Sequence, residues 1–209
     1  GILIPNLRQY FAVRRYLRKT VFDMKRLSDI YGSYLMATKD PFNSQKVLDI
    51  FWTTKNKYKP DILQMLDAAI NDRDTTKLKF CIAVSFRDGL DNDYADRFYK
   101  IILDTWHEEH EDIVECISNL KDEKFSEPLL EIAINGDKYR KFDDENESAL
   151  RKCVHALKTI NTTKSLGILS QLIDTKNPNV QYALDIYKKT TANMGFAASV
   201  AGRKFNRRF

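Results

Sequence analysis

The chain has 209 residues, of which 43% are hydrophobic and 30% charged, with a formal net charge of +5. These values support one or two compact domains, or one continuous array of helices, and exclude a chain that is disordered throughout. Seven Gly and five Pro are few for this length, and most of the prolines stand where a helix would begin, so we expect an almost entirely helical protein.

No apolar run is long enough to cross a bilayer. The first fifteen residues, GILIPNLRQYFAVRR, also lack the basic-then-apolar order and the cleavage site of a signal peptide. We therefore expect a cytoplasmic protein with no membrane partner.

Apolar residues recur every three or four positions through the first half of the chain, which predicts a series of amphipathic helices. Residues 1–38 predict capping helices, and residues 40–105 predict degenerate helix pairs. Gly89 ends one of these helices, and the helix after it is expected to carry Trp106 on its apolar face. Each helix start is indicated by a capping residue or by a proline in the first turn, at Asp40, Pro41, Pro60, Asp74 and Asp91 or Asn92.

The second half of the chain contains two similar blocks, HEDIVECISNLKDEKFSEPLLEIAI and ALRKCVHALKTINTTKSLGILSQLI. Both follow one helix-turn-helix pattern, and Leu120 at the first turn corresponds to Ile160 at the second, a spacing of 40 residues (160 − 120). A period of this size is typical of solenoids built from paired helices.

The motifs in these blocks resemble HEAT repeats. The first block has an IV-x-x-I-x-x-L helix from Ile113, a Lys-Asp turn and a PLLEIAI helix, and an Asp-x-x-x-Pro-x-Val opening follows the second block at Asp174. The resemblance implies an all-α fold, a right-handed α-α superhelix of antiparallel helix pairs, as a single helical-repeat domain over residues 1–209. It is clearest over residues 106–190 and leaves a basic C-terminal tail at 191–209. Solenoids of this kind usually hold another molecule.

The strongest candidate for chemistry is DTWHEEHEDIV, which places Asp104, His107 and His110 on one ridge if it is helical. The spacing of the two histidines differs from H-E-x-x-H, and acidic residues such as Glu108 and Glu109 are also expected near a helix N-terminus. We therefore expect a capped, solvated helix start rather than a metal ligand set.

Signatures of phosphate-binding loops and nucleophile elbows are absent from the sequence. Cys153 and His155 are two residues apart and would point to different faces of a helix. We expect no catalysis, no cofactor and no metal, and we expect all three cysteines, Cys81, Cys116 and Cys153, to be buried reduced thiols.

Charge is distributed unevenly along the chain. Residues 1–26 hold seven basic residues and one acidic residue, a net of +6, and residues 176–209 hold the same numbers. Residues 88–149 hold nineteen acidic and seven basic residues, a net of −12. The acidic middle favours a protein partner with a basic surface, because opposite charge steers association.

The most concrete expectation is a non-catalytic binding scaffold that inhibits a basic protein. A bacterial immunity protein that covers a nuclease toxin is one analogy, since several such proteins are built from helical repeats. The polar insertion at 135–147 is either a solvated loop or part of the binding surface. The expected partner contacts are Asp104, Trp106, Glu108, Glu109, Glu111, Asp112, Glu115, Tyr139, Asp143, Asp144 and Glu145.

The alternative is a nucleic-acid-binding repeat protein, because aromatic residues alternate with cations at both ends of the chain. A basic groove joining the termini would favour this alternative, and an acidic concave face would favour the basic protein partner. The residues that would contact phosphates are Arg14, Arg15, Arg18, Arg203, Lys204, Arg207 and Arg208.

Overall fold

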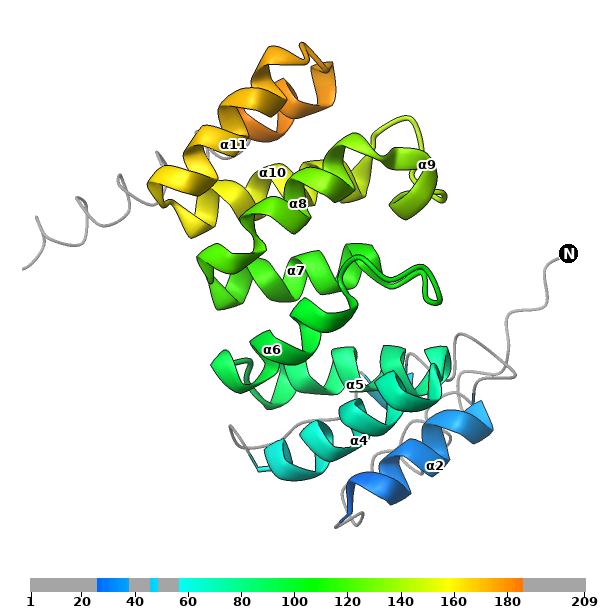
Figure 1. The fold of residues 1–209 in the computed structure, drawn as a ribbon. Coiled ribbons are helices and arrows are strands. Elements are labelled where there is room, and N and C mark those ends of the chain that lie inside the picture. Colours follow the sequence, from blue (N-terminus) through cyan, green and yellow to red (C-terminus); the bar gives the residue numbers. More distant parts are fainter. Residues whose placement is uncertain (1–25, 38–45, 49–56, 186–209) are drawn as a thin grey trace, which may run out of the picture. The chain divides into compact units, whose positions relative to one another are not determined.

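The computed structural model describes residues 26–37, 46–48 and 57–185, and these ranges contain helices and turns but no strand (Figure 1). The prediction of an all-α protein is thereby confirmed. Contacts divide the chain into two compact units, with the boundary between Arg97 and Phe98. Within the described ranges, no helix combines the length and the apolar character needed to span a bilayer.

The first unit contains α2 (Leu27–Ala37), α4 (Lys59–Asp72), α5 (Thr75–Asp88) and most of α6 (Asn92–Ile101). The predicted starts are confirmed where they are described. Pro60 stands in the first turn of α4, and the side chain of Asp74 caps α5 by accepting the Lys77 N–H at 2.9 Å. Gly89 ends α5 with a φ of 105°, a conformation that favours glycine. Asp40 and Pro41 lie outside the described residues.

A buried carboxylate organises the first unit. Asp88, at the end of α5, is fully buried, and both of its oxygens accept the backbone N–H of Tyr58 at 3.2 Å. This bond joins the end of α5 to the start of α4. Arg97 of α6 donates to both oxygens of Asp67 on α4, at 2.8 and 2.6 Å.

The second unit contains α7 (His110–Leu120), a 3₁₀ turn η1 (Glu123–Phe125), α8 (Ser126–Ile134), α9 (Gly136–Tyr139), α10 (Ser148–Ile160) and α11 (Thr163–Asp174). Residues 178–185 are also helical. The predicted turns after Leu120 and Ile160 are present, and each begins with a left-handed residue, Lys121 and Asn161. The helix α10 packs against α7, α8 and α11 (Figure 1).

Helices α7 and α10 lie parallel with one register along their contact. The pairs Glu111–Ser148, Glu115–Lys152 and Ser118–His155 are joined by hydrogen bonds, and the partners are 37 residues apart in each pair. The ion pair between Glu127 of α8 and Lys164 of α11 has the same separation (164 − 127). The facing residues are therefore 37 apart, whereas the first residues of the two helices are 38 apart (148 − 110) and the last residues 40 apart (160 − 120), since α10 has 13 residues and α7 has 11.

The prediction that the α6 helix continues to Trp106 is wrong. The helix ends at Ile101, and residues 102–109 form a turn and loop that leads into α7. Asp104, His107 and His110 therefore do not share a helical ridge. The histidines are not solvated either, since His107 is 2% and His110 3% exposed.

The three cysteines are buried and free, as predicted. Burial raises the pKa of Cys81 and Cys153 to about 12 and also raises that of Cys116. All three therefore remain thiols at neutral pH.

Candidate protein-binding edge

Two acidic segments that are far apart in the sequence meet at the N-terminal ends of α7 and α10. The carboxylate of Glu111 on α7 accepts the hydroxyl hydrogen of Ser148 on α10 at 2.8 Å. The charge of Asp144, in the loop before α10, also acts on Glu111. The acidic edge consists of Glu108, Glu111, Asp112, Glu115, Asp144 and Glu145.

Most of the acidic edge faces solvent. Glu111 is half-buried, and the other five residues are exposed. Lys152 of α10 forms ion pairs with Glu111 at 3.1 Å and with Glu115 at 2.6 Å. Glu108, Asp112, Asp144 and Glu145 form no salt bridge with any cation in the described part of the chain. These four carboxylates are the main source of negative charge on the edge.

A row of four aromatic rings lies beneath the edge. Successive ring centroids are 4.8 Å apart from Trp106 to His107, 4.7 Å from His107 to His110 and 5.2 Å from His110 to Tyr139. The row connects the loop before α7 to α9, and three of its members are almost fully buried. It fixes the position of residues 102–109 without a helix.

Both buried histidines hold the loop through backbone carbonyls. His107 donates from Nε2 to the Ile101 carbonyl at 2.9 Å, and its Nδ1 accepts the Glu109 N–H at 3.2 Å. His110 donates from Nε2 to the Asp104 carbonyl at 2.9 Å. Burial lowers the pKa of both rings, to about 4 for His110, where His107 contributes further. Both imidazoles are therefore neutral at pH 7.

Arg140 holds the segment between α9 and α10. Its Nε and one Nη donate to the carbonyls of Ile132 and Ala133 at the end of α8, at 3.1 and 2.9 Å. The other Nη donates to Asp143 at 2.9 Å and to Glu147 at 3.2 Å. The side chains of Arg140 and Asp143 are each 8% exposed, so this is a buried ion pair with several additional bonds.

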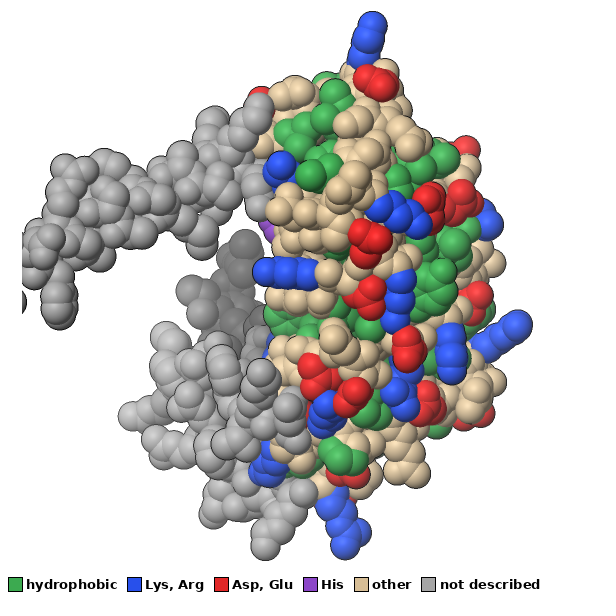
Figure 2. All heavy atoms as spheres, turned by 60° about the vertical axis from the view of Figure 1, so that its left-hand side comes forward, with side chains coloured by type: hydrophobic (Ala, Val, Ile, Leu, Met, Phe, Trp, Pro, Cys, Tyr) green, Lys and Arg blue, Asp and Glu red, His purple; other side chains and the backbone are tan. Residues whose placement is uncertain are grey.

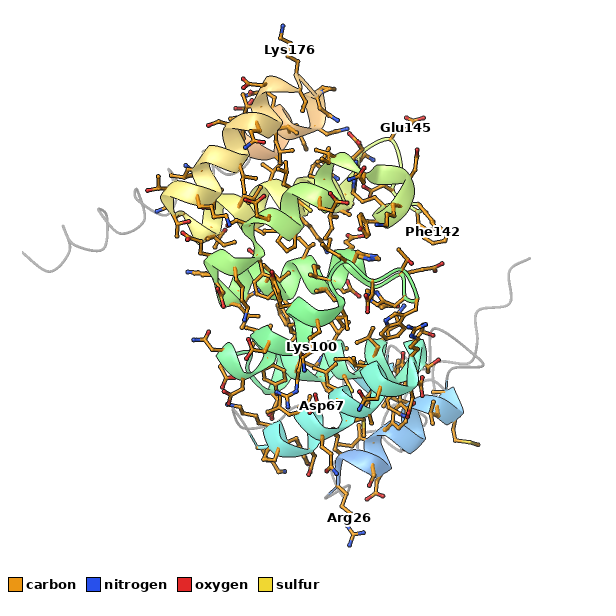
Figure 3. All side chains as sticks on the ribbon, in the orientation of Figure 1. Arg26, Asp67, Lys100, Phe142, Glu145 and Lys176 are labelled. Atoms are coloured by element: carbon orange, nitrogen blue, oxygen red, sulfur yellow. The ribbon has the colours of Figure 1, made fainter. Side chains whose placement is uncertain are left out.

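A pocket of about 80 Å³ opens at the acidic edge. Glu108, His110 and Glu111 line it from the α7 side, and Tyr139 and Phe142 line it from the segment around α9. Phe142 is 75% exposed, and it projects outward from this segment, as does Glu145 (Figure 3).

The structure separates the predicted contact residues into two groups. Tyr139 is 5% exposed and Asp143 accepts the Ala149 N–H at the start of α10, so both contribute mainly to internal packing. Trp106 is half-buried and donates to Asp104 at 2.9 Å. Glu109 is half-buried at the start of α7. The remaining predicted contacts are the six residues of the acidic edge.

Sequence reasoning missed Phe142 and Arg140. The available signal was an aromatic residue and an arginine within a polar insertion, where a solvated loop needs neither. The predicted nucleic-acid contacts, Arg14, Arg15, Arg18, Arg203, Lys204, Arg207 and Arg208, all lie outside the described residues.

The surface carries both signs of charge. On the face drawn in Figure 2, acidic and basic side chains of the described residues are interspersed, with apolar side chains between them. Across the described segments, no group of three or more His, Cys, Asp or Glu side chains is arranged to hold a metal ion.

Comparison with protein-family models, with curated proteins and with solved structures finds no match to this chain.

Proposed function

We propose that the second unit is a non-catalytic protein-binding scaffold of HEAT-like type. The support is the common separation of 37 residues, which relates α7 to α10 and α8 to α11. A constant separation between equivalent helices is typical of stacked helical units, the architecture of an α-α superhelix. Scaffolds of this kind bind partners along surfaces formed by equivalent helices of neighbouring units.

The proposed partner is a protein with a basic surface, and it binds at the acidic edge. The observation that carries this proposal is the Glu111–Ser148 hydrogen bond, because it brings the acidic start of α7 beside the acidic loop that precedes α10. Neither segment alone gives a broad charged surface. Together they place four carboxylates without described ion-pair partners at one end of two parallel helices, a field that would steer a cationic partner.

Basic surfaces are typical of nucleases, which must hold phosphates. An inhibitor that covers such a surface, like an immunity protein that protects a bacterium from a nuclease toxin, is the most concrete form of the proposal. It predicts that co-expression of this chain with its cognate toxin restores growth.

Affinity capture with charge-reversed variants tests the proposal. A variant with Glu108→Lys, Asp112→Lys and Glu145→Lys changes three exposed residues of the acidic edge. Proteins captured by the wild type and lost by this variant, measured by quantitative mass spectrometry, are expected to be basic.

The matched control reverses Asp29, Asp61 and Glu123, which are also exposed and also lie near helix starts. This control changes the net charge by the same amount, and it should capture the same proteins as the wild type. An equal loss in both variants would show that total charge matters and the acidic edge does not.

A further inference from the structure

The pocket at the acidic edge contains a hydrogen-bond acceptor that the described part of the chain leaves unused. Because a carbonyl oxygen only accepts, the bond to Asp104 requires the hydrogen of neutral His110 on Nε2, which leaves a lone pair on Nδ1. No described group bonds to this Nδ1, although the ring is 3% exposed and lines the pocket. An unused acceptor on a residue that lines a pocket can bind a ligand that donates hydrogen bonds.

Two carboxylates and an aromatic ring at the pocket can bind a cation. Glu108 and Glu111 add carboxylate acceptors, and the exposed ring of Phe142 adds an aromatic face at the mouth. The Arg140–Asp143 pair also lines the pocket, but both partners are already bonded to each other and to backbone groups. Because the opposite charges of Arg140 and Asp143 largely cancel, the pair does not repel a cation that enters the pocket.

Two more cations, Lys138 and Lys141, line the pocket and are exposed. The Nζ of Lys138 lies 4.6 Å from the centre of the Tyr139 ring. Both ammonium groups are on long flexible stems at the surface, so they can turn toward water when another cation enters.

The pocket is small. Its volume of about 80 Å³ is well below the roughly 300–1,000 Å³ of sites for small-molecule ligands, so it accommodates the end of one side chain. A guanidinium is planar, carries five N–H donors and stacks on aromatic rings, whereas an ammonium is compact and strongly hydrated.

We propose that this pocket receives an arginine side chain of the partner protein, whose guanidinium donates to His110 Nδ1 and to Glu108 or Glu111 and stacks on Phe142. This inference rests on the proposed function, since it supplies the residue-level specificity of the acidic edge. Phe142 acts as the aromatic anchor, and the Arg140–Asp143 bond holds the backbone segment that carries it, which lowers the entropy cost of binding.

The test uses two fluorescein-labelled peptides, nona-arginine and nona-lysine, with the full chain at one salt concentration. Fluorescence anisotropy gives Kd for each peptide. The wild type should bind nona-arginine more tightly than nona-lysine. Phe142→Ala should weaken nona-arginine binding about two- to five-fold, with a smaller effect on nona-lysine, and Phe142→Trp should retain the preference.

Phe86→Ala is the matched control, because Phe86 is an exposed phenylalanine of the first unit, and it should change neither Kd. Unchanged thermal unfolding of Phe142→Ala would show that the fold is intact. An unchanged nona-arginine Kd, or an equal loss for both peptides, would overturn the arginine pocket.

The proposed function fails separately from this inference. It fails if the wild type binds neither peptide, or if the triple variant at Glu108, Asp112 and Glu145 binds both as the wild type does. If the triple variant binds neither peptide while Phe142→Ala binds both with the Kd of the wild type, only the arginine pocket is excluded.

Discussion

The hydroxyl of Ser148 donates a 2.8 Å hydrogen bond to the carboxylate of Glu111, and this bond joins the first turn of α10 to the first turn of α7. Burial acts to raise the pKa of Glu111, but the bonds from Ser148 and Lys152 outweigh it, and the pKa is lowered. The anion of Glu111 is therefore a structural component of the acidic edge.

Replacing Ser148 with Ala should lower the free energy of unfolding at pH 7 by about 0.5–1 kcal/mol, because one hydrogen bond to a partly exposed carboxylate is lost. A carboxylate with a lowered folded pKa stabilises the fold above its unfolded pKa, and this contribution is lost as pH falls through the folded value. The difference between wild type and variant, measured by urea denaturation, should therefore shrink below about pH 4.5. A difference in the free energy of unfolding that stays constant with pH would contradict a stabilising bond from Ser148 to the ionised Glu111.

Arg140 should be one of the most sensitive positions of the second unit. Arg140→Ala removes four hydrogen bonds and leaves the buried Asp143 without its cation, so we expect a loss of about 3 kcal/mol in the free energy of unfolding. The exposed neighbour Lys141 is the control, and Lys141→Ala should stay within about 0.5 kcal/mol of the wild type. Urea denaturation measures both, and similar values for the two variants would argue against the Arg140 network.

Gly136 gives a second test of the same network. A Cβ atom at this position would lie 2.9 Å from Nη2 of Arg140, which is held by the Ala133 carbonyl. Gly136→Ala should therefore destabilise the wild type but not the Arg140→Ala variant, a coupling that a double-mutant cycle detects. Gly167 in α11 has nothing within 4 Å of an added Cβ, so Gly167→Ala should stabilise by about 0.5–1 kcal/mol. Independent effects at Gly136 and Arg140 would contradict the proposed coupling.

The buried histidines predict a loss of stability in mild acid. Their pKa values are lowered in the folded state, so the unfolded chain binds more protons between the ordinary value of 6.5 and the folded value of about 4 for His110. As the pH is lowered through this window, the free energy of unfolding should decrease by up to about 1.4 kcal/mol per pH unit for each histidine. His110→Gln should show a shallower slope in denaturation measured from pH 7 to pH 4. An equal slope would show that His110 does not titrate on unfolding.

Most of the helices could be predicted from the sequence, because their signals are local. Pro60, Asp74 and Gly89 act on the residues next to them, and the apolar period of α7 and α10 is a property of each helix alone. The acidic character of the edge was also visible, since charge is additive along a segment.

The loop at 102–109 could not be predicted because its backbone is held by long-range packing. The side chains of His107 and His110 bond the carbonyls of Ile101 and Asp104, in place of helical bonds. The His110 ring also packs against Tyr139, which lies about thirty residues later in the chain. The register of 37 residues was missed for a related reason, because the sequence shows helix ends, whereas the facing pairs depend on how α7 and α10 pack.

Hydrogen exchange of the complex tests the central claim most directly. When the captured basic partner is bound to the full chain, amides of residues 108–115 and 141–147 should exchange more slowly than in the free protein, and amides of α4 and α5 should be unchanged. Protection confined to other segments, with residues 108–115 and 141–147 unaffected, would contradict binding at the acidic edge.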